Sequence, residues 1–288
     1  MLLKTFLKIL FIFALTQAVY ADAKTSEDIN KLKAFVDSGI AYIKEHGAKK
    51  AYAEFNNPNG KFKQGELYLF VYDFNGTCLA DGATIGRVGK NFYTELDKYG
   101  TPVTRLKIAL AKTGAGFLSY YWPDPNTKEV HIKTSYIKKE NNTAIGAGIY
   151  KAIDVPQNLI EIKLEEVKAF INTGIEYFKK HGAKKAYKEF ANPNGPFRRG
   201  NRYFFIMSYK GIMLADGADP KEVGQDFYNV PDEFGTPFIQ LFIQIAKEGG
   251  GSVSYYWLEP TTKKNKLKVA YVMPLDKNSF IASGFYGD

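Results

Sequence analysis

The chain has 288 residues, of which 45% are hydrophobic and 15% aromatic, and its formal net charge at pH 7 is +9. This length fits two domains of ordinary size, and the aromatic content excludes a disordered chain. The one cysteine, Cys78, excludes an intramolecular disulfide and a thiolate metal cluster. The basic residues are spread along the chain rather than gathered in a patch, so a nucleic-acid partner is not predicted.

Residues 1–21 are predicted to be a signal peptide. Two lysines precede a short apolar stretch, and small residues follow it, with cleavage after Ala21 or Ala23. The apolar stretch is shorter than the roughly 20 residues that span a bilayer, although an uncleaved anchor is the alternative. No other apolar run is long enough, so we expect the mature chain to lack a transmembrane helix and to be periplasmic or secreted.

From residue 25 onward, the pattern predicts helices that alternate with short strands. A helix starts near Thr25 and Asp28 and continues, with a pause at Gly47, to Phe55. The dipeptide Asn75-Gly76 indicates a hairpin. Thr101 is expected to cap a second helix. The predicted strands are Leu67–Phe74, Thr77–Ala80, Phe117–Trp122, Val130–Ile137 and Thr143–Tyr150.

The same pattern then occurs a second time, offset by 135 residues. His46–Tyr52 returns as His181–Tyr187, and Ser119–Trp122 returns as Ser254–Trp257. About half of the aligned positions are identical, which indicates a domain duplication rather than a solenoid, whose period is roughly 20–50 residues. We therefore predict a first domain at 22–150, a linker at 151–160 and a second domain at 161–288. Short turns between neighbouring strands make each sheet antiparallel, so the fold class is α+β.

Several spaced motifs of this chain resemble a known family. The segments FVYDFNGTCLADGATIGRVGKNFY, GAGFLSYYWPDP and AIGAGIY of the first copy, with LADGADPKEVGQDFY, GGGSVSYYW and IASGFY of the second, resemble the single Cache domain of type 2. Domains of this family are extracytoplasmic sensors. The resemblance implies two tandem PAS-like Cache domains, each with a long N-terminal helix and an antiparallel sheet of about five strands.

The resemblance also implies a function. It predicts an exported sensor that binds a small organic acid such as acetate, propionate, pyruvate or lactate in a pocket on one face of the sheet. No kinase or methyl-accepting region follows the second copy, so we expect a separate membrane signalling or transport protein as partner. Both copies read Leu-Ala-Asp-Gly where the family often has Leu-Ala-His-Gly, which leaves the ligand class open.

Strand alternation points independently to one lysine in each copy. Lys133 shares a strand face with Ser135 and Ile137, and its counterpart Lys268 shares a face with small apolar residues. A lysine on such a face is expected to aim its ammonium group into a pocket, where it can bind a carboxylate. The alternative is a lysine whose stem packs against the sheet while its head reaches water.

The candidate ligand-binding set combines these lysines with nearby aromatic and acidic residues. The aromatic rings would wall the alkyl part of the ligand, or they form an ordinary core. The aspartates would accept from a ligand or pair with the lysine, or they are turn residues. The set is Lys133, Tyr120, Tyr121, Trp122, Tyr136 and Asp81, with Lys268, Tyr255, Tyr256, Trp257, Tyr271 and Asp216.

The sequence carries no motif for catalysis, metal or cofactor binding, so neither an enzyme nor a cofactor is predicted. The alternative function is a structural or protein-interaction module with non-functional pockets. The two copies differ at several positions, for example Arg87 against Glu222 and Phe117 against Ser252. We therefore expect that the two pockets differ in ligand, or that only one of them binds.

Overall fold

The computed structural model describes residues 27–97, 100–151 and 157–287. The predicted signal peptide and the start of the first helix near Thr25 lie outside the described residues. Within the described segments, no helix combines the length and the apolar character needed to cross a membrane. We call residues 27–151 the first half and residues 157–287 the second half.

The first half begins with a helical pair. Residues 27–46 form one helix, and Gly47, at φ 79°, separates it from α2 (Ala48–Phe55). Glycine adopts this left-handed conformation at little cost, so it marks the expected pause. The elements that follow are β1 (Lys63–Gln64), β2 (Leu67–Tyr68), β3 (Phe70–Asp73), β4 (Cys78–Asp81), η1 (Ile85–Arg87), α3 (Val103–Lys112), β5 (Ala115–Pro123), β6 (Val130–Glu140) and β7 (Thr143–Lys151).

The second half repeats this succession. Its long helix α4 begins at Gln157, inside the segment 151–160 that was predicted as a linker. Its elements are α4 (Gln157–His181), α5 (Ala183–Phe190), β8 (Arg198–Arg199), β9 (Arg202–Tyr203), β10 (Phe205–Ser208), β11 (Met213–Asp216), η2 (Pro220–Glu222), α6 (Phe238–Lys247), β12 (Gly251–Leu258), β13 (Asn265–Pro274) and β14 (Ser279–Tyr286).

Ten of these strands form one antiparallel sheet in the order β11-β10-β14-β13-β12-β5-β6-β7-β3-β4. Each half supplies five neighbouring strands in the same internal order, which confirms the prediction of about five antiparallel strands per copy. The halves meet where Ser119 of β5 pairs with Ser254 of β12. These two serines are equivalent in the duplication, so the junction relates the two halves by an approximate twofold symmetry.

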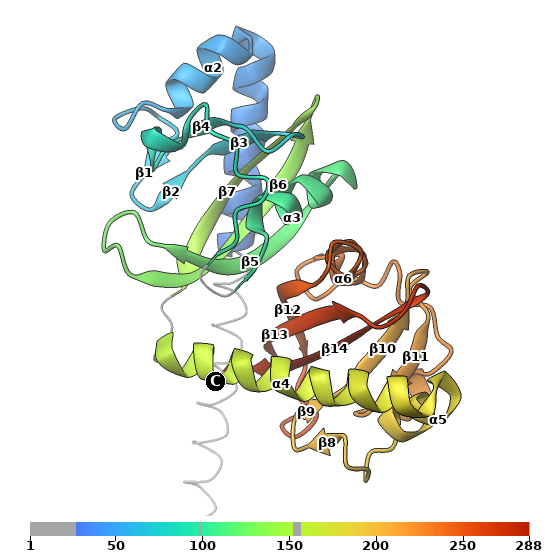
Figure 1. Ribbon diagram of the computed structural model, residues 1–288. Helices are drawn as coiled ribbons and strands as arrows, with labels where there is room; N and C mark the ends of the chain where they lie inside the picture. The colour runs from blue at the N-terminus through green and yellow to red at the C-terminus, as the bar shows by residue number, and fades with distance from the viewer. Residues whose placement is uncertain (1–26, 98–99, 152–156, 288) are drawn as a thin grey trace, which may run out of the picture.

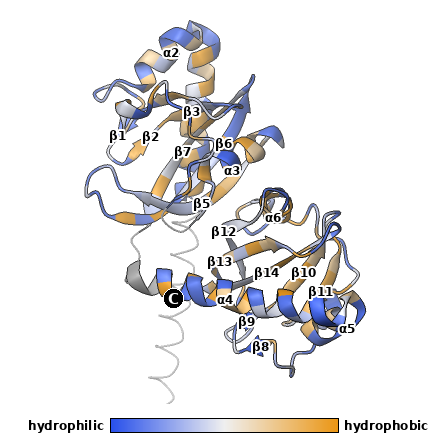
Figure 2. Cartoon of the chain, viewed as in Figure 1, coloured by the Kyte–Doolittle hydropathy of each residue, from blue (hydrophilic) through white to orange (hydrophobic). Residues whose placement is uncertain are grey.

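Helices cover both faces of the sheet (Figure 1). The first helical pair and the pair α4 and α5 cover one face, where they pack against residues such as Leu69 and Ile206. Figure 2 shows hydrophilic and hydrophobic segments alternating along α4, as expected for an amphipathic helix with one buried stripe. The single helices α3 and α6 cover the other face and share one continuous core.

Polar contacts add to the junction between the halves. The hydroxyl oxygens of Thr101 and Ser252 lie 2.7 Å apart, and Arg105 forms an ion pair with Glu248. Thr101 was predicted to cap α3, but no side chain caps this helix, which begins at Val103 after Pro102. The Thr101 side chain bonds across the junction because Ser252 takes the place that Phe117 has in the first half.

Gly148 lets the side chains of Ser135 and Lys133 pack closely against the backbone of β7. A Cβ atom added at Gly148 would lie 2.4 Å from Ser135 Oγ and 2.5 Å from Lys133 Cε. We expect Gly148→Ala to lower the free energy of unfolding by about 1–3 kcal/mol, as overpacking does. Gly86→Ala, whose Cβ would meet no described atom within 4 Å, is the matched control in urea denaturation. An equal free energy of unfolding for the two variants would contradict the close packing of Ser135 and Lys133 against Gly148.

Candidate functional site

The two predicted lysines are buried on the face of the sheet that α3 and α6 cover. Lys133 is 0% exposed and Lys268 is 1% exposed. Ser135 and Ile137, on the same face of β6, are also 0% exposed. The predicted strand alternation is therefore confirmed, and the alternative in which the lysine heads reach water is wrong.

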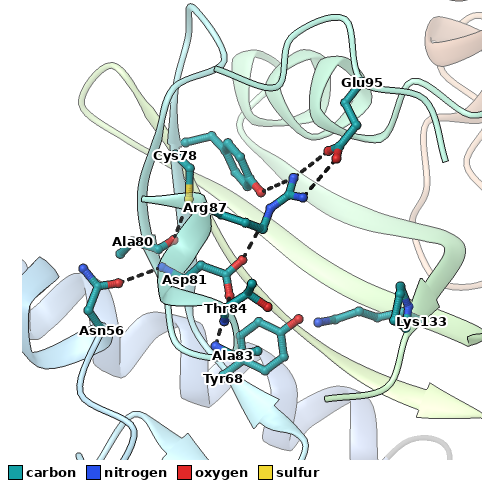
Figure 3. A network of polar contacts seen from close by, with 12 residues as sticks. Asn56, Tyr68, Cys78, Ala80, Asp81, Ala83, Thr84, Arg87, Glu95 and Lys133 are labelled. Atoms are coloured by element: carbon teal, nitrogen blue, oxygen red, sulfur yellow. Dashed lines mark hydrogen bonds and ion pairs between the residues drawn. The ribbon is translucent and has the colours of Figure 1, made fainter. Parts of the chain in front are cut away.

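In the first half, two tyrosines, Tyr68 and Tyr150, contact the ammonium group of Lys133. Its Nζ donates to Tyr150 Oη at 3.1 Å and lies 3.8 Å from the ring centre of Tyr68. Figure 3 shows the Lys133 side chain pointing toward Tyr68. The two tyrosine hydroxyls are 3.2 Å apart, and that of Tyr150 donates to the backbone oxygen of Pro123 at 3.1 Å. Burial, followed by the like charge of Lys107, moves the pKa of Lys133 well below its usual value.

The second half has an equivalent chain of hydrogen bonds. Lys268 Nζ donates to Tyr203 Oη at 2.8 Å, and Tyr203 Oη lies 3.4 Å from Tyr286 Oη. The hydroxyl of Tyr286 donates to the backbone oxygen of Leu258 at 2.9 Å. Burial lowers the pKa of Lys268 to about 7, although Asp216 and Glu222 oppose this shift. Each lysine is thus held in the fold by a pair of tyrosines.

A second buried lysine lies in the first half, on α3. Lys107 is 2% exposed, and four aromatic rings surround its Nζ. The distances from Nζ to the ring centres are 4.2 Å for Phe70, 4.7 Å for Tyr120, 5.2 Å for Trp122 and 5.3 Å for Tyr72. Burial, followed by the like charge of Arg87, lowers the pKa of Lys107 to about 7. The faces of these aromatic rings stabilise the protonated form of Lys107, but only in part.

Arg87 connects Asp81, the last residue of β4, to a second acidic residue, Glu95. Its two terminal nitrogens bind Glu95 at 3.0 and 2.5 Å, while its Nε lies 3.9 Å from Asp81 Oδ2 (Figure 3). Asp81 Oδ1 accepts the backbone N–H groups of Ala83 and Thr84. Asp81 is therefore a turn residue that also presents charge to the site, so the two interpretations of this aspartate are compatible.

The two halves differ in the charge of this region. In the first half, three basic side chains (Lys107, Lys133 and Arg87) lie near two acidic ones (Asp81 and Glu95). In the second half, Phe242 replaces Lys107, Glu222 replaces Arg87 and Val230 replaces Glu95. One lysine, Lys268, then faces two carboxylates, Asp216 and Glu222. Basic side chains thus outnumber acidic ones at the first-half site, and acidic side chains outnumber basic ones at the equivalent second-half site.

A small cavity of about 20 Å³ lies at the second-half site. Its wall includes the rings of Tyr203, Tyr255 and Trp257 together with Asp216, Glu222 and Lys268. This volume holds roughly one water-sized group, for which about 10–15 Å³ is needed. In the described residues, no group of three His, Cys, Asp or Glu side chains is placed to hold a metal ion.

Four of the predicted aromatic residues do not join these sites. Tyr121, Tyr136 and Tyr271 lie among the residues under the long helices, on the opposite face from the lysines. Tyr256 contacts Phe234 edge-on, with ring centres 4.6 Å apart. Alternation along a strand puts only every second side chain on one face, so Tyr120, Trp122, Tyr255 and Trp257 reach the lysine side while their neighbours do not.

Sequence reasoning missed the tyrosines that hold the lysines, and it missed Lys107. Tyr68 and Tyr150 come from strands distant in sequence, so their meeting with Lys133 could not be seen in a local pattern. The burial of Lys107, in contrast, could have been predicted from the helical spacing. This lysine lies four residues after Val103 and four before Ala111, and both of these are buried. A lysine on the apolar stripe of a helix is therefore a candidate buried cation.

Comparison with known families gives one match that covers most of the chain. Residues 41–288 match the Cache domain model dCache_2. This one model covers both copies, so it supports a single Cache domain of that type and does not support two separate type 2 single Cache domains. The chain is also 32% identical over 85 residues to the sensor histidine kinase MctS of Rhizobium johnstonii. That stretch is 29% of this chain but only 18% of the kinase.

Solved structures of sensory domains are similar to parts of the chain. A methyl-accepting chemotaxis protein of Vibrio parahaemolyticus is 23% identical, with a TM-score of 0.41 over 45% of this chain and 92% of its own. A Cache chemosensory domain whose title describes carboxylic acid recognition is 23% identical, with a TM-score of 0.40 over 47% of this chain and 100% of its own.

The buried lysines predict how stability depends on pH. Between pH 7 and 10, unfolded Lys107 carries a proton that the folded residue has largely lost, because its pKa in the fold is about 7. Stability should therefore rise with pH in this window, by up to about 1.4 kcal/mol per pH unit for this group. Below pH 7 both states are protonated, so the contribution is constant.

Lys107→Met removes this contribution while keeping a long apolar side chain. We expect the variant to gain less stability than the wild type between pH 7 and pH 9 in urea denaturation. Parallel pH profiles for the two proteins would show that Lys107 keeps an ordinary pKa in the fold.

Proposed function

Because this chain belongs to the Cache domain family, we propose that it is an extracytoplasmic sensor that binds a small organic acid such as acetate, propionate, pyruvate or lactate. Cache domains are sensory ligand-binding modules, and the proposal adds the class of ligand, the site and the cellular context. We assign the acid to the first-half site, among Lys107, Lys133 and Arg87.

Two buried lysines in the first half, neither of them in an ion pair among the described residues, carry this proposal. An uncompensated ion in a protein interior costs several kcal/mol unless it is paired or loses its charge. Arg87 is paired with Glu95 and also lies 3.9 Å from Asp81, so among the described residues neither Lys107 nor Lys133 has a carboxylate in ion-pair distance. A carboxylate ligand would supply the missing negative charge through charge-assisted hydrogen bonds, which are stronger than neutral ones.

The arrangement of the rings suits the apolar part of a small acid. Phe70 is near both ammonium groups, with its ring centre 4.2 Å from Lys107 Nζ and 5.7 Å from Lys133 Nζ. Tyr120 and Trp122 complete the wall on the side of β5. A few fixed polar groups within an aromatic wall are typical of sites for small ligands.

We further propose that each half is one tandem sensory unit. The duplicated sequence and the repeated five-strand order support this division. A separate membrane signalling or transport protein would read the bound state, and the protein would act in the periplasm or after secretion. The alternative is a structural or protein-interaction module, in which the lysines serve only the packing of the core.

Lys107 gives the sharpest test of the acid site. We expect the full chain to bind at least one of the four acids in isothermal titration calorimetry. Lys107→Met should weaken this binding by about tenfold or more, because it removes a hydrogen bond to a charged group. Lys49→Met, which removes an exposed lysine on α2, is the matched control and should bind as the wild type does. A chain that binds none of the acids would favour the structural alternative.

The same site predicts a pH dependence of binding. A bound carboxylate stabilises the protonated form of Lys107, whose pKa without ligand is about 7. Affinity for the acid should therefore fall as the pH rises from 6 to 8. An affinity that stays constant or rises over this range would argue against an anion beside Lys107.

A further inference from the structure

We infer that the second-half cavity binds a small protonated amine of about the size of methylammonium, and thus has a charge preference opposite to that of the first-half site. This site goes beyond the proposed acid sensor and does not depend on it. The inference rests on the residues that line the cavity, on their counterparts in the first half and on the size of the cavity.

Aromatic rings and two carboxylates line much of the cavity, together with aliphatic side chains and Lys268. Tyr255 and Trp257 of β12 and Phe238 of α6 form one wall, with the rings of Phe238 and Tyr255 stacked at 4.5 Å. Asp216 and Glu222 contribute carboxylates to the lining. Ring faces beside carboxylates attract an ammonium group, and such aromatic cages are a common means of binding organic cations.

The size of the cavity limits the ligand. Its volume of about 20 Å³ accommodates one water-sized group. A protonated amino head fits this space, whereas a carboxylate with its alkyl part is larger. Glu222 and Trp257 are the partly exposed members of the lining, so the alkyl end of an amine would lie toward them.

Glu222 is the residue that makes the second site acidic. It takes the position of Arg87, and Val230 takes the position of the Arg87 partner Glu95. Among the described residues, no cationic nitrogen lies within 4.0 Å of the Glu222 carboxylate. Burial raises the pKa of Glu222 to about 7, with smaller contributions in the same direction from Asp216 and Asp219, while Lys268 acts against the shift. An ammonium ligand would supply the missing partner.

Lys268 does not prevent a cation from binding. Its Nζ is already bound to Tyr203, whose hydroxyl continues to Tyr286 and the backbone of β12. Burial lowers its pKa to about 7, so it can lose its proton at modest cost when a second cation enters. Asp216 accepts the N–H groups of Ala218 and Asp219 through Oδ1, and its carboxylate also lines the cavity.

The test uses the full chain and methylammonium chloride, with sodium chloride at equal ionic strength as the blank. We expect binding by isothermal titration calorimetry, and we expect Glu222→Gln to weaken it by about tenfold or more through loss of a charge-assisted hydrogen bond. Glu176→Gln, at an exposed position on α4, is the matched control and should bind as the wild type does. Affinity should rise from pH 6 to pH 8, as Glu222 ionises.

Glu222→Arg is a second variant that places the first-half residue in the second half. It should abolish methylammonium binding while circular dichroism shows an unchanged fold. Wild-type affinity in either Glu222 variant, or no binding of methylammonium by the wild type, would overturn the inference. Lys107→Met separates the two sites, because it should lower acid binding and leave methylammonium binding unchanged. If the chain binds an acid but not methylammonium, the proposed function holds and the inference about the second-half cavity fails.

Discussion

The burial of lysine ammonium groups against tyrosine hydroxyls is the constraint on which the rest of this structure depends. Lys133 and Lys268 are removed from water, and each donates to a tyrosine within 3.1 Å. A buried charge is costly, so the fold must satisfy it, neutralise it or present it to a ligand. Strand alternation, the covering helices α3 and α6, and the close approach at Gly148 all serve to hold these groups in place.

Duplication lets one half act as a comparison for the other. The lysine, the turn aspartate and the tyrosine pair are present in both halves, so they belong to the common scaffold. Three positions around them changed together: Lys107 to Phe242, Arg87 to Glu222 and Glu95 to Val230. Together these changes reverse the local balance of charge without altering the strand order. Differences of this kind point to separate ligands more strongly than scattered surface substitutions do.

The sequence predicted the fold class, the antiparallel strands and the face on which the lysines lie, because these follow from local periodicity. The sequence could not show which of the neighbours Tyr120 and Tyr121 lies on the side of the lysines. That depends on which face of the sheet the helices α3 and α6 cover. The partners Tyr68 and Tyr150 come from different strands, so only the folded sheet brings them together. Helix α4 begins at Gln157, within the segment 151–160 that the sequence predicted to be a linker.

The central claim is that the first half keeps a buried lysine, Lys107, whose protonated form an anion can stabilise. Nuclear magnetic resonance titration of lysine side chains labelled at Cε and Nζ measures this directly. The account predicts a resonance of Lys107, assigned with Lys107→Met, that titrates near pH 7 and moves to a higher pKa when a bound carboxylate is present. A Lys107 that titrates near its usual value of about 10.4, with or without acid, would contradict it.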